Sequence, residues 1–131
     1  MVDEAVAVGS AAFALEAWIY LAEAYLRRGE AERALETIDD AERTLGMASS
    51  PLAAHLTRVR AVALEQMGHP TGALEQAELA IEIARRQRLL YEEEQAHRVL
   101  AELLTARGED GKAREALGEA DRLAERLAEL S

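Results

Sequence analysis

Three histidines and a dense set of carboxylates are the side chains in this chain whose types could support chemistry. The histidines are His55, His69 and His97, and Glu93 lies one helical turn before His97. A glutamate and a histidine at this spacing could hold a metal ion, but a zinc site takes three or four protein ligands. No cysteine and no second nearby histidine completes such a set. A solvated Glu–His pair on a helix is therefore the simpler interpretation.

The sequence also lacks the short motifs that mark common catalytic sites. It contains no His-Glu-x-x-His, no glycine-rich phosphate loop followed by lysine, and no nucleophile motif. The run Glu92–Glu94 is better explained as the exposed start of a helix, where the helix dipole favours negative charge. We therefore expect no enzymatic activity, no catalytic residues, no metal and no cofactor.

Charge and composition exclude further classes of partner. The 131 residues carry a formal net charge of −10, and Lys112 is the one lysine. Nucleic acids and anionic membrane surfaces bind basic protein surfaces. Because this chain is acidic, neither is an expected partner. The longest apolar stretches, 11–15 and 17–22, are too short to cross a membrane. We expect a cytoplasmic protein whose partner is a protein or a peptide.

Four small residues recur along the chain at one spacing. Ala22, Ala61 and Ala101 stand 39 and then 40 residues apart, and three further sets keep nearly the same offsets. These sets are Gly29, Gly68 and Gly108; Ala34, Ala73 and Ala113; and Ala41, Ala80 and Ala120. A fixed period of this length is typical of stacked helical arrays, in which no unit buries its apolar face alone.

Helix start and stop signals divide each period into two helices. Glycine after a basic last turn suits the left-handed position that ends a helix, and proline suits the first helical turn. The predicted helices are approximately 10–28, 30–45, 51–67, 70–87, 90–107 and 109–130. The junction 86–90 has neither glycine nor proline, so its boundary is the least defined. The fold class predicted is all-α.

The three hairpins resemble tetratricopeptide repeats. Counting from Leu15, unit one matches the consensus of that family at Trp18, Leu21, Ala22, Tyr25, Gly29, Ala34, Ile38 and Ala41. Units two and three match less fully, with Thr57 and His97 at the tryptophan position. The resemblance implies a right-handed α-solenoid of three antiparallel helix hairpins, over approximately 15–50, 51–90 and 91–131, with residues 10–131 as one domain.

The units are longer than the family's usual period of about 34 residues. Such long units resemble those of large bacterial regulators, including LuxR-type activators and cyclases fused to an ATPase module. Residues 1–9 are similar to the tail of a preceding repeat helix, or form an N-terminal extension. We therefore expect a segment of a larger bacterial regulator that serves protein–protein interaction or signal sensing. The alternatives are a self-association (dimerisation) module and a peptide or small-ligand sensor.

By the same resemblance, the first helix of each hairpin lines a concave groove that binds a partner. The groove residues implied are Glu16, Ile19, Glu23, His55, Arg58, Val62, Glu65, Gln95, Arg98 and Glu102. Arg58 and Arg98 occupy equivalent positions and suit a carboxylate or backbone carbonyls of the partner. The alternative is that these side chains form a solvated face and the partner binds elsewhere.

Two further predictions concern packing. Arg60 stands where the family has leucine, so we expect its guanidinium either to reach the surface or to pair with a carboxylate from a neighbouring helix. On the last helix, the face expected to meet its partner helix consists of Ala113, Leu117, Ala120 and Ala124, and a second apolar stripe lies beside it. This stripe consists of Ala116, Leu123, Leu127 and Leu130. An uncovered apolar stripe predicts a homodimer through the C-terminal helix.

Overall fold

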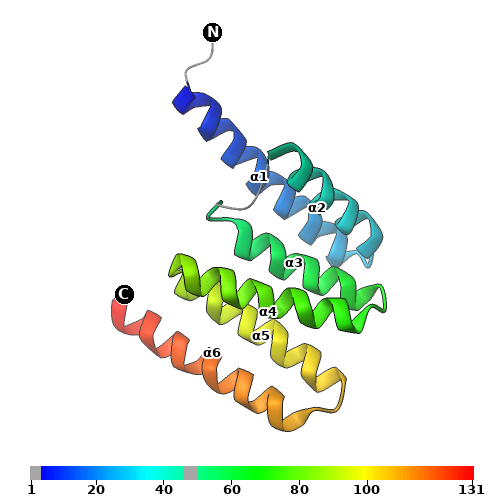
Figure 1. Cartoon of the computed structure of the whole chain (residues 1–131), viewed down its shortest axis with the longest axis vertical. Helices are drawn as coiled ribbons and strands as arrows, with labels where there is room; N and C mark the ends of the chain where they lie inside the picture. The colour runs from blue at the N-terminus through cyan, green and yellow to red at the C-terminus, as the bar shows by residue number, and fades with distance from the viewer. Residues whose placement is uncertain (1–3, 46–49) are drawn as a thin grey trace.

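Six α-helices make up nearly all of the described chain. The computed structural model describes residues 4–45 and 50–131, with side chains for 13–44 and 50–131. The helices are α1 (Glu4–Arg27), α2 (Ala31–Leu45), α3 (Ala53–Gln66), α4 (Pro70–Gln87), α5 (Leu90–Ala106) and α6 (Asp110–Leu130) (Figure 1). No strand occurs in the two described segments. The all-α prediction is confirmed, and five of the six helices begin and end within about two residues of the predicted bounds.

The first helix is longer at its start than predicted. It runs from Glu4 to Arg27 without a break, so residues 4–9 extend this helix and are not the end of a separate one. Residues 1–3 of the expected N-terminal segment lie outside the described residues, as do residues 46–49 between α2 and α3.

The three glycines of the repeat end the first helix of each hairpin in the same way. Gly29, Gly68 and Gly108 have φ angles of 74°, 79° and 75°, the left-handed region that suits glycine. After α1, the Gly29 amide donates to the Leu26 carbonyl at 3.0 Å and the Glu30 amide to the Tyr25 carbonyl at 2.8 Å. These two bonds form a Schellman turn, which satisfies carbonyls that the helix end leaves unpaired.

The junction between α4 and α5 makes the same turn without a glycine. Arg88 has a φ of 58°, and it is the one non-glycine residue with positive φ in the described chain. Its amide donates to the Arg85 carbonyl at 3.1 Å, and the Leu89 amide donates to the Ala84 carbonyl at 2.9 Å. Since side chains with a Cβ are strained in this region, hydrogen bonding and packing must impose the conformation.

Helices cross closely where the recurring alanines lie. All nine are buried with exposed fractions of 3% or less: Ala22, Ala34, Ala41, Ala61, Ala73, Ala80, Ala101, Ala113 and Ala120. Larger side chains fill the spaces beside them, with Ile19, Ile38 and Leu56 at 1% exposure or less. Small residues at these positions suit close helix packing, because a methyl side chain lets two backbones approach.

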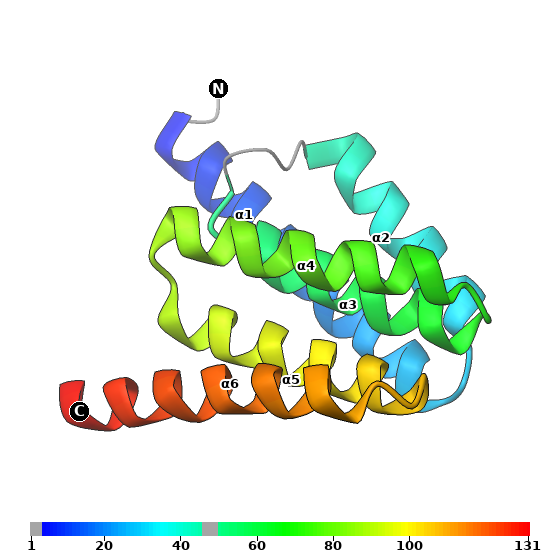
Figure 2. The same ribbon diagram turned by 60° about the horizontal axis from the view of Figure 1, so that its bottom comes forward.

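Each helix packs against the next along the chain, and the hairpins follow one another along the molecule (Figure 1). The odd-numbered helices also contact each other, α1 with α3 and α3 with α5. Within the described residues, α2 makes no comparable contact with α4, nor α4 with α6. Turning the molecule shows α4 lying over α3 and α6 lying over α5 (Figure 2). The odd-numbered helices therefore form the continuous layer of the fold.

Candidate partner-binding surface

Ion pairs on the layer of odd-numbered helices join neighbouring hairpins. His55 Nε2 on α3 lies 2.7 Å from Glu23 Oε1 on α1, and Arg58 Nη2 donates to Glu92 Oε2 on α5 at 3.0 Å. The two side chains of the second pair are 16% and 18% exposed. Both residues were predicted to face a partner, and in this structure both side chains are in contact with carboxylates of the chain.

Arg98 differs from Arg58 although the two positions are equivalent in the repeat. Its guanidinium bonds to Glu94 Oε2 on its own helix at 3.0 Å and to Asp121 Oδ1 on α6 at 3.5 Å. The hydrogen bond to the Glu94 carboxylate raises the pKa of Arg98, with a further contribution from its charge. Arg98 therefore joins the two helices of one hairpin, whereas Arg58 joins two hairpins.

Glu65 takes part in a contact that the sequence did not predict. Arg107, which directly follows α5, donates from Nη2 to Glu65 Oε1 at 2.9 Å and to the Pro70 carbonyl at 2.7 Å. Arg107 also bonds to the Leu103 carbonyl in the last turn of α5 at 2.5 Å. Arg107 and Glu92 are thus the residues that sequence reasoning missed on this layer.

The remaining predicted groove residues lie in unlike surroundings. Ile19 is 1% exposed and belongs to the core, so its side chain is not on the accessible face. Glu16 and Glu102 are exposed, and Gln95 is half-buried. Glu16 accepts a hydrogen bond from the Tyr20 hydroxyl at 3.2 Å, which raises the pKa of Tyr20.

A small cleft lies between α1 and α3. Its volume is about 190 Å³, and it brings together three of the predicted groove residues, Glu23, Arg58 and Val62. Leu26, Arg27 and Val59 complete its lining. The cleft has apolar walls and both signs of charge at its edge, so it has the size and chemistry to receive one side chain of a peptide.

A larger pocket, of about 550 Å³, lies where α4, α5 and α6 meet. Leu74 and Glu78 line it from α4, His97 and Leu100 from α5, and Glu115 and Glu119 from α6. No motif in the sequence pointed to this pocket, because its residues come from three helices at unrelated spacings.

His97 is buried beside this pocket, contrary to the prediction of a solvated pair. It is 6% exposed, and its Nε2 lies 3.7 Å from Glu93 Oε2, whose side chain is 12% exposed. Neither ring nitrogen has a hydrogen-bond partner among the described residues. Burial lowers the pKa of His97, the charge of Arg85 lowers it further, and Glu93 and Glu119 oppose both effects. In the described part of the chain, no three His, Asp or Glu side chains are placed to hold a metal ion.

The predicted self-association stripe is not a free surface. Ala116 and Leu123 are each 6% exposed, because the buried face of α6 against α5 runs through Ala113, Ala116, Ala120 and Leu123. Leu127 is half-buried, and Leu130 is 74% exposed. Leu117, which was expected to meet α5, is 41% exposed. Ala113 and Ala120 are buried as predicted, but Ala116 and Leu123, and not Leu117, complete the buried face of α6.

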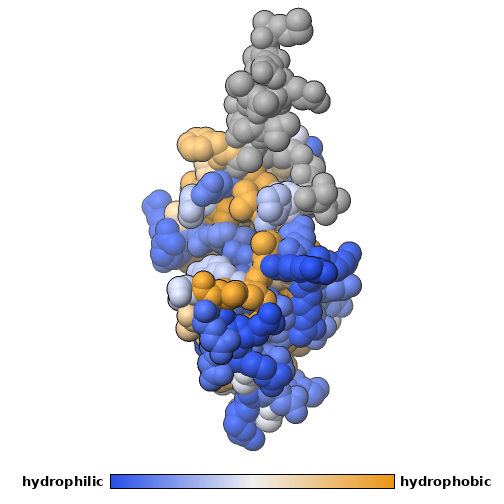
Figure 3. Space-filling model, turned by 90° about the vertical axis from the view of Figure 1, so that its left-hand side faces the viewer, coloured by the Kyte–Doolittle hydropathy of each residue, from blue (hydrophilic) through white to orange (hydrophobic). Residues whose placement is uncertain are grey.

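Hydrophilic side chains cover most of the lower end of the molecule in the view of Figure 3, and the apolar areas there are small and separated. None of the described helices combines the length and apolar character needed to span a bilayer. Searches of protein-family models, of curated proteins and of solved structures found nothing that matches this chain.

Proposed function

We propose that the chain is a non-catalytic protein-interaction or signal-sensing module, built as a tetratricopeptide-like right-handed solenoid and belonging to a larger bacterial regulator. Three features support the architecture: equivalent alanines buried at each crossing, equivalent left-handed glycines at each hairpin turn, and contacts between odd-numbered helices of adjacent hairpins. In such arrays the continuous layer offers an extended surface to a partner.

The observation that carries this proposal is the cleft between α1 and α3. It gathers Glu23, Arg58 and Val62, which come from two hairpins and which the resemblance to tetratricopeptide repeats implies on one face. Because Arg58 is already bonded to Glu92, a partner would meet a guanidinium held in place and not a mobile one. A fixed donor loses less side-chain entropy when a ligand binds.

A peptide-display selection against the folded chain tests the proposal. Selected peptides are expected to bind the parent and to lose affinity for Val62→Glu, which places a carboxylate in the cleft. Leu79→Glu is the matched control, because Leu79 is 37% exposed on α4 and lies outside the cleft. Peptides that bind the parent and Val62→Glu equally would contradict the proposed site.

Self-association is a second candidate function, and one comparison within the molecule favours it. Tyr20 is 58% exposed on α1, whereas Val59, its equivalent on α3, is 3% exposed beneath a neighbouring hairpin. Likewise Leu117 is 41% exposed on α6, whereas its equivalent Ile38 is fully buried. Both ends of the array thus present apolar side chains at positions that a further hairpin covers inside it.

Light scattering coupled to size exclusion tests this second function. We expect the parent at tens of micromolar to be heavier than one chain, and the double variant Tyr20→Glu with Leu117→Glu to be a monomer. Leu123→Glu is unsuitable here because Leu123 is buried within the chain. A monomeric parent would exclude self-association through these ends under those conditions.

A further inference from the structure

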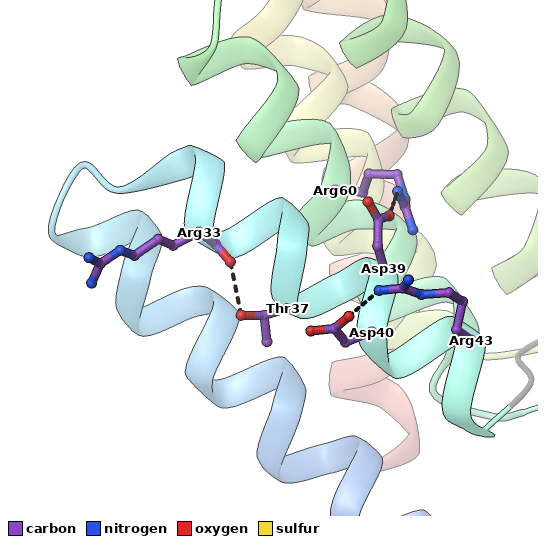
Figure 4. Close-up of polar contacts among 6 residues, drawn as sticks. All are labelled: Arg33, Thr37, Asp39, Asp40, Arg43 and Arg60. Atoms are coloured by element: carbon purple, nitrogen blue, oxygen red, sulfur yellow. Dashed lines mark hydrogen bonds and ion pairs between the residues drawn. The ribbon is translucent and has the colours of Figure 1, made fainter.

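The pocket between α4 and α6 has an equivalent one hairpin earlier, and that equivalent is occupied by the chain itself. By the repeat offsets, Leu100 in the pocket corresponds to Arg60, and Glu78 corresponds to Asp39. Arg60 extends from α3 toward α2, and its Nη1 donates to Asp39 Oδ1 at 2.8 Å. Figure 4 shows the two side chains meeting between their helices. Arg60 Nη2 also lies 2.7 Å from Glu42 Oε1.

Pairing with a carboxylate of a neighbouring helix is one of the two outcomes predicted for Arg60. The contact also shows what chemistry the surface of α2 beside α3 accepts. The Arg60 side chain is only 18% exposed, so its stem lies against the helices while its guanidinium reaches the carboxylates. A guanidinium suits such a site because its planar fork can bond two carboxylates at once.

Between the second and third hairpins, one of the two acidic residues of this arrangement has an acidic counterpart, and the arginine has no basic one. Glu78 stands in place of Asp39, Ile81 in place of Glu42, and Leu100 in place of Arg60. Among the described residues, Glu78 and Glu115 have no ion pair within 4.0 Å. Lys112 is the one basic side chain lining the pocket, and its nitrogen lies 3.8 Å from Glu109.

The floor of the pocket supplies a second, independent observation. His97 lines it, is 6% exposed, and has no hydrogen-bond partner for either ring nitrogen among the described residues. Buried polar groups in folded proteins are normally hydrogen-bonded, so an unbonded histidine at a pocket suggests that another molecule completes the site. Leu74 and Leu100 provide the apolar wall that an aliphatic stem requires.

We infer that this pocket binds an arginine side chain of a partner protein, with the stem against Leu74 and Leu100 and the guanidinium between Glu78 and the acidic side chains of α6. The bound arginine contacts Glu78 as Arg60 contacts Asp39 one hairpin earlier, and glutamates of α6 supply the second carboxylate that Glu42 supplies there. Four glutamates against one lysine line the pocket, which favours a cationic group over a neutral or acidic one. Except for Ala116 of the apolar stripe on α6, the pocket shares no residue with the predicted partner sites, so the inference is independent of the proposed function.

Amide chemical shifts of the labelled, full chain provide the test. The probe is an acetylated and amidated pentapeptide with arginine at its centre between alanines. The matched control is the same peptide with citrulline, which keeps the shape but removes the charge. We expect the arginine peptide to shift resonances of α4, α5 and α6 around the pocket, with a dissociation constant on the order of 1 mM. Equal shifts with the citrulline peptide would overturn the inference.

Two variants make the assignment specific. Glu78→Gln should weaken the binding of the arginine peptide by about three- to fivefold, as expected for a partly exposed charge pair. Glu82→Gln is the control, because Glu82 is exposed on the same helix and pairs with Arg86 outside the pocket. Leu100→Arg should abolish binding, since it places a guanidinium in the pocket as Arg60 does one hairpin earlier.

The other outcomes are equally decisive. Should Leu100→Arg fail to fold, Glu78→Gln and Glu82→Gln still decide the matter, and equal affinity for these two variants would refute the assignment. Agmatine, a free alkylguanidinium, serves as a further probe. Tighter binding of agmatine than of the peptide would identify a site for small cations and overturn the inferred protein partner.

Discussion

The interior of the array and its two ends contain the same kinds of helix in different surroundings. Val59 and Tyr20 are equivalent positions, and so are Ile38 and Leu117. The interior members are buried, whereas Tyr20 and Leu117 are 58% and 41% exposed. The position in the hairpin is therefore not enough to bury a side chain; a neighbouring hairpin must cover it. This comparison leads to predictions of unequal effects at equivalent positions.

The largest effect is expected where a large side chain is covered from two sides. Ile38→Ala should lower the free energy of unfolding by about 2–5 kcal/mol, because it leaves a cavity between three helices. Leu117→Ala at the equivalent end position should cost less than about 1 kcal/mol, because the side chain is partly exposed already. Urea unfolding of both variants measures the difference. Equal losses would show that the end is covered in solution.

The next largest effect on stability is expected from a larger side chain at the crossing of two helices. Ala61→Leu should cost about 1–3 kcal/mol, because Ala61 is fully buried where α3 meets α4. Ala17→Leu, on the exposed face of α1, is the matched control and should leave the melting temperature nearly unchanged. A similar melting temperature for both variants would mean that the crossing tolerates a larger side chain and that the alanine spacing is not a packing requirement.

The helix turns provide a comparison of glycine with arginine in one conformation. Gly68→Ala should cost about 1 kcal/mol, because alanine is strained at a φ of 79°. Arg88→Gly should stabilise by about 0.5 kcal/mol, since relief of strain exceeds the entropy that glycine adds to the unfolded chain. Thermal unfolding of the two variants checks the opposite signs. Destabilisation by Arg88→Gly would show that the arginine side chain itself holds the turn.

The ion pairs of Arg60 are expected to contribute little. Asp39 and Glu42 are 55% and 43% exposed, so water screens much of the attraction. Arg60→Leu, which copies the residue found in the next hairpin, should change the unfolding free energy by less than about 1 kcal/mol in either direction. A larger loss in denaturant unfolding would reveal a specific buried network between α2 and α3.

The smallest effect concerns the dependence of stability on pH. Burial chiefly holds the pKa of His97 below its unfolded value, so the unfolded chain binds a proton more readily. Stability is then fully present above the unfolded pKa and is lost as the pH falls from there toward the folded pKa. His97→Gln should reduce the loss of stability between pH 7.5 and 5.5 relative to the parent. An unchanged pH profile would indicate that His97 is hydrated.

Much of the fold could be predicted from the sequence because local signals agreed with the packing. Gly29, Gly68 and Gly108 each follow the end of a helix with a positive φ angle. Pro70 is the first residue of α4, a position that its fixed φ angle favours. Arg88 could not be predicted, since arginine carries no signal for a left-handed turn. The turn there depends on the two helices that it joins.

The candidate site was less predictable, because it depends on side chains from different helices. On α6, two apolar stripes lie side by side, one through Leu117 and one through Leu123. Only the way in which α6 crosses α5 decides that Leu123 is buried. Similarly, Glu23 and Arg58 line one cleft, but their contacts with His55 and Glu92 depend on the spacing between hairpins.

Amide hydrogen exchange along the native chain tests the central claim, that neighbouring hairpins determine what each helix buries. The account predicts the slowest exchange in α3, α4 and α5, with protection decreasing toward the start of α1 and the end of α6. At low protein concentration this gradient should be visible at both ends. Uniform protection along all six helices of the monomer would contradict the account, because the ends would then be as stable as the covered interior.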